Sequence, residues 1–361
     1  MPFTRRTALR HISAALVFGA LSTRAAWAED EVPLVSNEEA TPTQPGGVGT
    51  DVRAPEEPAF RPVVRPLKNT ADLPGTLLLS SSRERPGIGD TTDRYRLFTL
   101  QGGALTRISY PDEELGPSAA VLSQDGKQAL VVAGSRAIYL LDLKGGTGPR
   151  PVLQRLEAIS PSQSDSYMGV AWSLDETRVM VARPKPFGMT VVSVADGASV
   201  LTPYLGFQPS FAPDGKQFAF SYLAPGEPAA AIYVAPTDGL DAPRKLTPTQ
   251  AYETWPAWLG DGQRIAYLSR GDTWEVHVWN LRTQAEQVVA RSPSTDTAIV
   301  GFVFSQDGEW VACSLLEART QQRSVRVVSV LDTSVWLDLP REGAWNDRAL
   351  SWADGSAAAR A

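Results

Sequence analysis

The sequence predicts an all-β fold, a six-bladed β-propeller of four-stranded antiparallel blades. An aspartate, usually followed by glycine, recurs at intervals of 39 to 50 residues, and a large apolar residue stands three positions before it in five of the six copies. Repeats of this length with several short β-type runs are typical of propeller blades. The six anchors of the repeat are Asp125-Gly126, Asp175-Glu176, Asp214-Gly215, Asp261-Gly262, Asp307-Gly308 and Asp354-Gly355.

Residues 1–28 have the pattern of an export signal peptide. Three arginines within the first ten residues form a basic start, residues 12–21 an apolar core, and Ala26-Trp27-Ala28 a small-x-small cleavage site. The adjacent Arg5 and Arg6 favour twin-arginine export, while the general secretory (Sec) route stays open because Ala8 replaces the usual phenylalanine. We therefore expect a periplasmic or otherwise exported protein. Cleavage removes four arginines and no acidic residue, which changes the formal charge from −6 to −10.

Residues 29–72 predict a disordered tether. They are rich in proline, glutamate and threonine, and they show neither helical nor strand periodicity. Such a segment cannot bury enough apolar surface to offset the entropy lost on ordering. A recognition segment that orders on a partner, centred on residues 60–67, is the alternative. The propeller is then expected over residues 73–361.

The most complete blade lies within residues 208–248. Asp214 and Gly215 supply the left-handed backbone that a tight reversal between the first two strands needs. Four short strands bury little by themselves, so each blade must pack against its neighbours. The strands expected in this blade are residues 208–212, 217–222, 231–236 and 244–247.

The two ends of the propeller region complement each other. Almost no chain follows the anchor at Asp354, whereas residues 76–81, 95–100 and 104–108 are typical of a second, third and fourth strand with no first. We therefore expect one blade to take its inner strand from residues 349–352 and its outer strands from residues 76–109. Pairing of the N-terminal and C-terminal strands would close the ring and cover the open sheet edges.

The repeat resembles a known family. Phe211-Ala212-Pro213-Asp214-Gly215-Lys216, the following Phe218-Ala219-Phe220 and Ile232-Tyr233-Val234, then Asp238-Gly239 and Leu246-Thr247 are similar to the WD40-like (PD40) repeats of TolB-like six-bladed propellers. The resemblance covers roughly residues 73 to 361 and implies the propeller fold. It implies no single function, because this repeat also occurs in periplasmic TolB and in the propellers of prolyl-oligopeptidase-like enzymes.

The sequence offers few groups for catalysis or metal binding. His277 is the one histidine after the signal, and we expect a partly exposed or hydrogen-bonded strand residue, with a functional role as the alternative. Cys313 lies in an apolar run and predicts a buried thiol. There is no G-x-S-x-G motif. The sequence thus predicts no catalytic residue, no metal site and no cofactor, and the anchor aspartates are expected to serve the turns.

Loop lengths indicate a binding face. The turns after the first and third strands are expected to be short, and the loops on the opposite face long and irregular. Binding residues concentrate on such loops. Residues that enter the inner strands there are candidate contacts for a protein or peptide, although they could instead cap the interfaces between blades. These candidates are Tyr167, Gln208, Trp255 and Trp345.

Two main functions stay open at this point, with a small-ligand sensor or a propeller that assists assembly of another exported complex as a third possibility. The first is an exported, non-enzymatic propeller that acts as a protein or peptide interaction scaffold in the periplasm or cell envelope. The alternative is a hydrolase or lyase that acts on a carbohydrate or peptide through carboxylates in the channel. The net negative charge argues against a nucleic-acid partner. No stretch after the signal reaches the roughly 18 apolar residues of a membrane helix. We expect a monomer.

Overall fold

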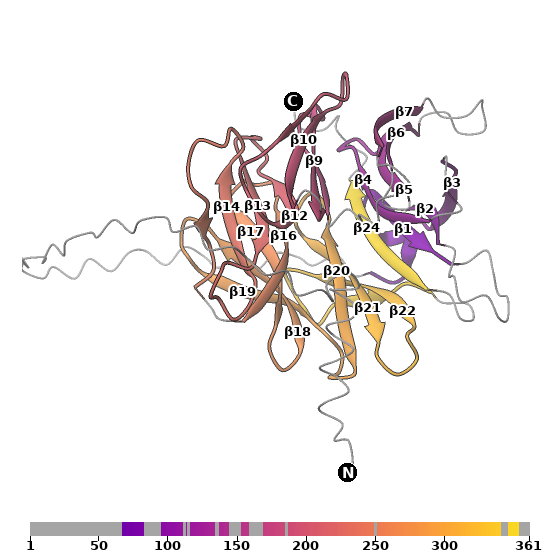
Figure 1. Cartoon of the computed structure of the whole chain (residues 1–361). Helices are drawn as coiled ribbons and strands as arrows, with labels where there is room; N and C mark the ends of the chain where they lie inside the picture. Colours follow the sequence, from indigo (N-terminus) through magenta and orange to yellow (C-terminus); the bar gives the residue numbers. More distant parts are fainter. Residues whose placement is uncertain are drawn as a thin grey trace, which may run out of the picture. The chain divides into compact units, whose positions relative to one another are not determined.

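The structure, a computed structural model, confirms the predicted fold class: six four-stranded antiparallel sheets form the blades of a six-bladed β-propeller (Figure 1). The ranges that it describes all belong to one compact unit, residues 61–361. None of the helices in them is both long and apolar enough to cross a membrane. The structure describes residues 67–82, 95–110, 113, 116–133, 137–143, 153–158, 169–184, 187–248, 251–340 and 346–353.

The strands occur where the repeat predicts them, with ends shifted by a residue or two. In five blades they run from the inner to the outer edge in chain order, whereas the closing blade has the order β24, β1, β2, β3. Blade 1 comprises β4 Pro117–Leu122, β5 Gln128–Ala133, β6 Ala137–Asp142 and β7 Leu153–Ala158; blade 2, β8 Val170–Trp172, β9 Arg178–Pro184, β10 Phe187–Ser193 and β11 Ser199–Leu201; blade 3, β12 Phe207–Phe211, β13 Gln217–Tyr222, β14 Ala231–Pro236 and β15 Arg244–Lys245. Blade 4 comprises β16 Tyr252–Trp258, β17 Arg264–Arg270, β18 Trp274–Asn280 and β19 Glu286–Arg291; blade 5, β20 Thr297–Phe304, β21 Trp310–Glu317, β22 Arg323–Ser329 and β23 Trp336–Asp338; the closing blade, β24 Asp347–Ala353, β1 Thr76–Ser81, β2 Arg96–Gln101 and β3 Ala104–Ile108.

The closing blade joins the two ends of the propeller, as predicted. β24 pairs antiparallel with β1, so that Trp352 lies opposite Leu77. Figure 1 shows the yellow β24 beside the indigo β1. Trp352 also fastens the start of the described chain, because its Nε1 donates a hydrogen bond of 2.7 Å to the carbonyl oxygen of Pro74. The segment before β1 contains the 3-10 turn η1, Thr70–Asp72, which the side chain of Asn69 caps.

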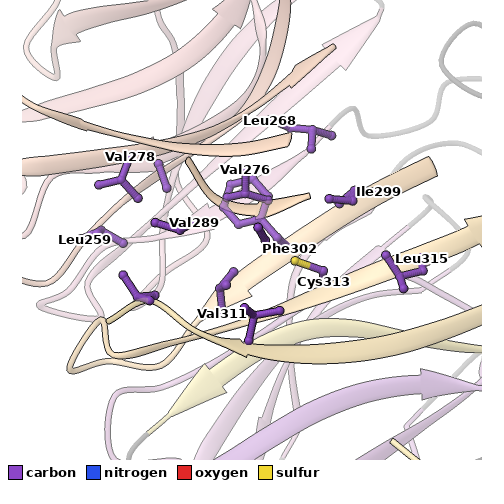
Figure 2. Packing of buried hydrophobic residues seen from close by; sticks show 14 residues of the cluster. Leu259, Leu268, Val276, Val278, Val289, Ile299, Phe302, Val311, Cys313 and Leu315 are labelled. Carbon is purple, nitrogen blue, oxygen red and sulfur yellow. The ribbon is translucent and has the colours of Figure 1, made fainter. Parts of the chain in front are cut away.

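The core of the propeller lies between the blades. Each pair of neighbouring blades encloses its own cluster of buried apolar side chains. Figure 2 shows the cluster between blades 4 and 5, where Val276 and Leu268 meet Phe302 and Cys313. The thiol of Cys313 is buried as predicted, and burial raises its pKa to about 12.

A strand between two such clusters is apolar on both faces. In β21, Val311 and Cys313 contact the cluster with blade 4, while Trp310 and Ala312 contact the cluster with the closing blade. This explains why the second strands are continuous apolar runs rather than alternating ones. It also explains the column three positions before the anchors, because each member packs in a different cluster: Leu122, Trp172, Phe211, Trp258, Phe304 and, one position closer to its anchor, Trp352.

The anchor aspartates build the turns between first and second strands. In five of these turns the Oδ1 atom accepts the backbone N–H two residues later at 2.9–3.1 Å. The next residue takes a left-handed conformation, with φ +65° at Gly215 and +59° at Glu176, the one copy without glycine. The structural interpretation of the described anchors is thereby confirmed; Asp354 lies outside the described residues.

Candidate binding face

The blades end at two faces of the disc. The turn face carries the Asp turns, such as residues 212–216, together with the turns from third to fourth strands. The loop face carries the loops from second to third strands and the connections between blades. The predicted difference in loop length is only partly right. Residues 223–230 separate β13 from β14. In contrast, β9 ends at Pro184 and β10 begins at Phe187, so this hairpin closes almost directly.

Loop length therefore does not separate the two faces, and the inner strands have to be compared instead. The inner strands β4, β12, β16, β20 and β24 each contain a register shift in their pairing with the second strand. In β12 and β16 the shift places Gln208 and Trp255 in left-handed conformations, with φ +55° and +54°. Such a conformation costs a non-glycine residue about 1–2 kcal/mol. The equivalent residues of blades 2 and 5 are Gly169 and Gly301, also at positive φ.

The structure brings two predicted site residues together. The side-chain Oε1 of Gln208 accepts a hydrogen bond of 2.9 Å from the backbone N–H of Trp255 and one of 3.1 Å from the hydroxyl of Ser221. Gln208 thus links the inner strands of blades 3 and 4. On its other side it approaches Gly169, where a Cβ atom would lie 2.6 Å from the Cα of Gln208. The inner strands of three consecutive blades are therefore held closely at this level.

The indole of Trp255 is partly buried and packs against the cluster between blades 4 and 5. This contact agrees with the alternative that such aromatic residues cap the blade interfaces, while part of the ring stays exposed. The other two predicted residues, Tyr167 and Trp345, lie outside the described residues.

Two inner strands carry buried carboxylates at the loop face. Glu253 in β16 and Asp347 in β24 are each 1% exposed. Glu253 accepts a hydrogen bond from the hydroxyl of Thr247, and Asp347 accepts one of 2.5 Å from Ser81. These bonds tie the starts of the inner strands to neighbouring chain. Among the described residues, no cluster of three or more histidine, cysteine or acidic side chains is arranged to hold a metal ion.

His277 lies away from the inner strands, in β18. Val276 and Val278 are buried toward blade 5, and His277 occupies the opposite face of the sheet, as strand alternation predicts. Its ring stacks on Tyr267 at 5.4 Å and contacts Glu275 (Nε2, 3.0 Å) and Glu286 (Nδ1, 2.8 Å). The expected hydrogen-bonded strand histidine is therefore confirmed. Burial and a hydrogen bond to Glu286 raise the pKa of Tyr267, so that its hydroxyl remains a donor.

Sequence reasoning missed two arginines at the loop face. Arg323 begins β22 in blade 5, and Arg348 is the second residue of β24 in the closing blade. Desolvation and then the nearby positive charge of Arg323 lower the pKa of Arg348. Arg323 lies over the ring of Tyr95, with its guanidinium carbon 5.8 Å from the ring centre. The signal available in the sequence was Arg348 itself, a cation directly before the predicted inner strand, which in the structure begins earlier, at Asp347.

Comparison with known proteins supports the fold alone. No family model matches the sequence, and neither does any curated protein. Among solved structures, an oligogalacturonate lyase in complex with manganese is 16% identical, with a TM-score of 0.51 over 76% of this chain and 76% of that chain. A putative TolB from Agrobacterium tumefaciens is 15% identical, with a TM-score of 0.52 over 77% of this chain and 99% of that chain. The chain therefore shares its fold with an oligogalacturonate lyase and with a putative TolB.

Proposed function

We propose that the protein is an exported, non-enzymatic propeller that binds a protein or peptide partner at its loop face. The observation that supports this proposal is the pair of left-handed residues, Gln208 and Trp255, on adjacent inner strands. Residues in such strained conformations cluster at active sites and ligand clamps, where the surrounding structure holds them in place. At the turn face the left-handed residues are mainly glycines, with Glu176 and Gln284 as exceptions.

The proposal places the protein outside the cytoplasm, because residues 1–28 have the pattern of an export signal. Fractionation of the native host, with detection of the chain cut after Ala28, tests this part. Recovery of the uncut chain in the cytoplasm would contradict it.

Two exposed leucines of blade 3 offer a matched test of the binding face. Leu223 is 47% exposed in the loop after β13, at the loop face, and Leu240 is 82% exposed in the turn after β14, at the turn face. A photoreactive amino acid is introduced at either position, and cross-linking is carried out in the native host. We expect a specific cross-linked partner from position 223 and none from position 240. Equal cross-linking at both positions, or cross-linking from 240 alone, would reject the proposed face.

A propeller enzyme acting on a carbohydrate or peptide is the second candidate. The observation that favours it is the presence of buried carboxylates, Glu253 and Asp347, on two inner strands. The fold also occurs in an oligogalacturonate lyase. The purified protein is assayed with oligogalacturonate and with a peptide library. Turnover that is lost in both Glu253→Gln and Asp347→Asn would establish this candidate in place of the scaffold, and absence of turnover on either substrate class counts against it.

A further inference from the structure

Arg348 is a cation without a partner in the described part of the chain. It is partly buried at the start of β24, and no described side chain forms a hydrogen bond or ion pair with its guanidinium. The adjacent Asp347 is engaged by the hydroxyl of Ser81. A partly buried charge without a partner is costly, and native proteins rarely keep one without a reason.

Arg323 brings a second positive charge to the same place. Its backbone N–H donates a hydrogen bond of 2.7 Å to the side-chain oxygen of Asn346, directly before β24. Its Nη1 atom lies 3.4 Å from the hydroxyl of Tyr95, and no carboxylate among the described residues pairs with it. Arg326, three residues further along β22, instead makes a two-pronged ion pair with Asp338 at 2.7 and 2.9 Å. The lack of a carboxylate is therefore specific to the end of the strand at the loop face.

Ser80 is a further polar group that the described chain leaves unsatisfied. It lies directly opposite Arg348 in the pairing of β1 with β24, so the two side chains leave the same face of the sheet. Ser80 is fully buried, and its hydroxyl has no hydrogen-bond partner among the described residues. Two neighbouring polar residues at the loop face, Ser80 and Arg348, thus have hydrogen-bonding groups that no described residue of the propeller satisfies.

We propose that Arg348 and Arg323 form a binding site for a carboxylate group at the loop face of the closing blade. The guanidinium fork matches the two oxygens of a carboxylate, and the low exposure of Arg348 strengthens such a pair. The inference rests on the proposed function, since a peptide partner carries carboxylates on acidic side chains and at its C-terminus. The bound carboxylate would supply the negative charge that this pair of arginines lacks.

Three acetylated tetra-alanine probes separate the two sources of a carboxylate. One has a free C-terminus, the second is amidated and carries one glutamate in place of an alanine, and the third is amidated with no charge. Binding to the purified mature protein is measured by titration calorimetry. We expect one or both carboxylate probes to bind at least tenfold more tightly than the neutral probe, and their order identifies the source. Equal binding of all three, or tighter binding of inorganic phosphate than of either carboxylate probe, would overturn the proposal.

Variants assign the binding to this site. Arg348→Met and Arg323→Met should each weaken binding of the carboxylate probe at least tenfold, and Arg348→Lys should weaken it less, because the charge remains without the fork. Arg319→Met is the matched control, since Arg319 is an exposed arginine in the loop just before β22. Unchanged affinity in Arg348→Met, or an equal loss in Arg319→Met, would refute the assignment.

Stability without a ligand gives an independent readout. Removal of a partly buried cation that has no partner should raise the thermal midpoint of Arg348→Met above that of the wild type. A lower midpoint together with unchanged carboxylate affinity would show a purely structural role. Probe binding requires no partner protein, so it can hold even if cross-linking at Leu223 rejects the proposed function, and the two failures are distinguishable.

Discussion

The closure of the ring can be tested with a matched pair of tryptophans. Trp352 and Trp258 occupy equivalent positions of the closing blade and blade 4, and each packs between blades. The indole N–H of Trp352 donates to the carbonyl of Pro74, whereas the indole N–H of Trp258 is buried without a hydrogen-bond partner among the described residues. Replacement by phenylalanine removes a similar volume at both positions but acts oppositely on hydrogen bonding.

The expected difference follows from these two environments. Trp352→Phe loses one hydrogen bond, which costs about 1 kcal/mol, because Pro74 is partly exposed and its carbonyl oxygen can accept a hydrogen bond from water instead. Trp258→Phe removes an unsatisfied buried donor, which recovers about 1 kcal/mol or more of desolvation cost. The packing losses largely cancel between the two variants. Trp352→Phe should therefore be less stable than Trp258→Phe by about 2 kcal/mol.

Equilibrium urea unfolding followed by far-ultraviolet circular dichroism measures this difference, since fluorescence would change with the number of tryptophans. We expect the unfolding midpoint to shift while the slope with denaturant stays constant. Equal midpoints for the two variants, or a lower midpoint for Trp258→Phe, would contradict the assigned role of the Trp352 hydrogen bond in holding the closing blade.

Two further predictions concern the inner strands and the turn face. Gly169→Ala should lower the free energy of unfolding by about 3 kcal/mol, because the new Cβ would meet the backbone of Gln208 and φ is +139°. Gly226→Ala, in open space at φ +85°, should lower it by about 1 kcal/mol. Equal thermal midpoints of the two variants would contradict the close approach of the inner strands. The side-chain hydrogen bond from Lys127 holds the pKa of Asp125 at about 2, below its ordinary 3.8, so the stability that Asp125 contributes is present above pH 3.8 and is lost as the pH falls toward 2. The thermal midpoint of Asp125→Asn should consequently fall less than that of the wild type between pH 4 and pH 2, and parallel curves would refute this.

The fold was predictable because its signals are local. An Asp-Gly turn needs only its own residues, since the aspartate caps the N–H two positions later and the glycine accepts positive φ. The apolar residue three positions before an anchor is a local signal of the same kind, because it marks a side chain that packs between two blades, as Phe211 and Trp258 do. Loop length was a weaker guide, since hairpins such as that between β9 and β10 close directly even on the face of the longer connections.

The candidate site was only partly predictable, because it depends on contacts between blades. Gln208 and Trp255 were predicted from their position at the start of an inner strand. Their left-handed backbone and the hydrogen bond between them were not predicted. A proline follows each of them at the same distance from its anchor, and this shared Gln-Pro and Trp-Pro spacing was the available signal. No sequence pattern relates Arg323 to Arg348, since they come together only when β24 packs against blade 5.

Hydrogen bonding at the two faces supports the choice of the loop face. At the turn face, Ser123 donates to Asp125 at 2.8 Å and Ser305 donates to Asp307 at 2.6 Å, while the same aspartates accept backbone N–H groups. Those polar groups form hydrogen bonds with one another, so few of their donors and acceptors remain for a ligand. At the loop face, Arg348 has no described partner and Arg323 no described carboxylate. Because stability alone would favour satisfying or removing such groups, their retention is best explained by a ligand that completes them.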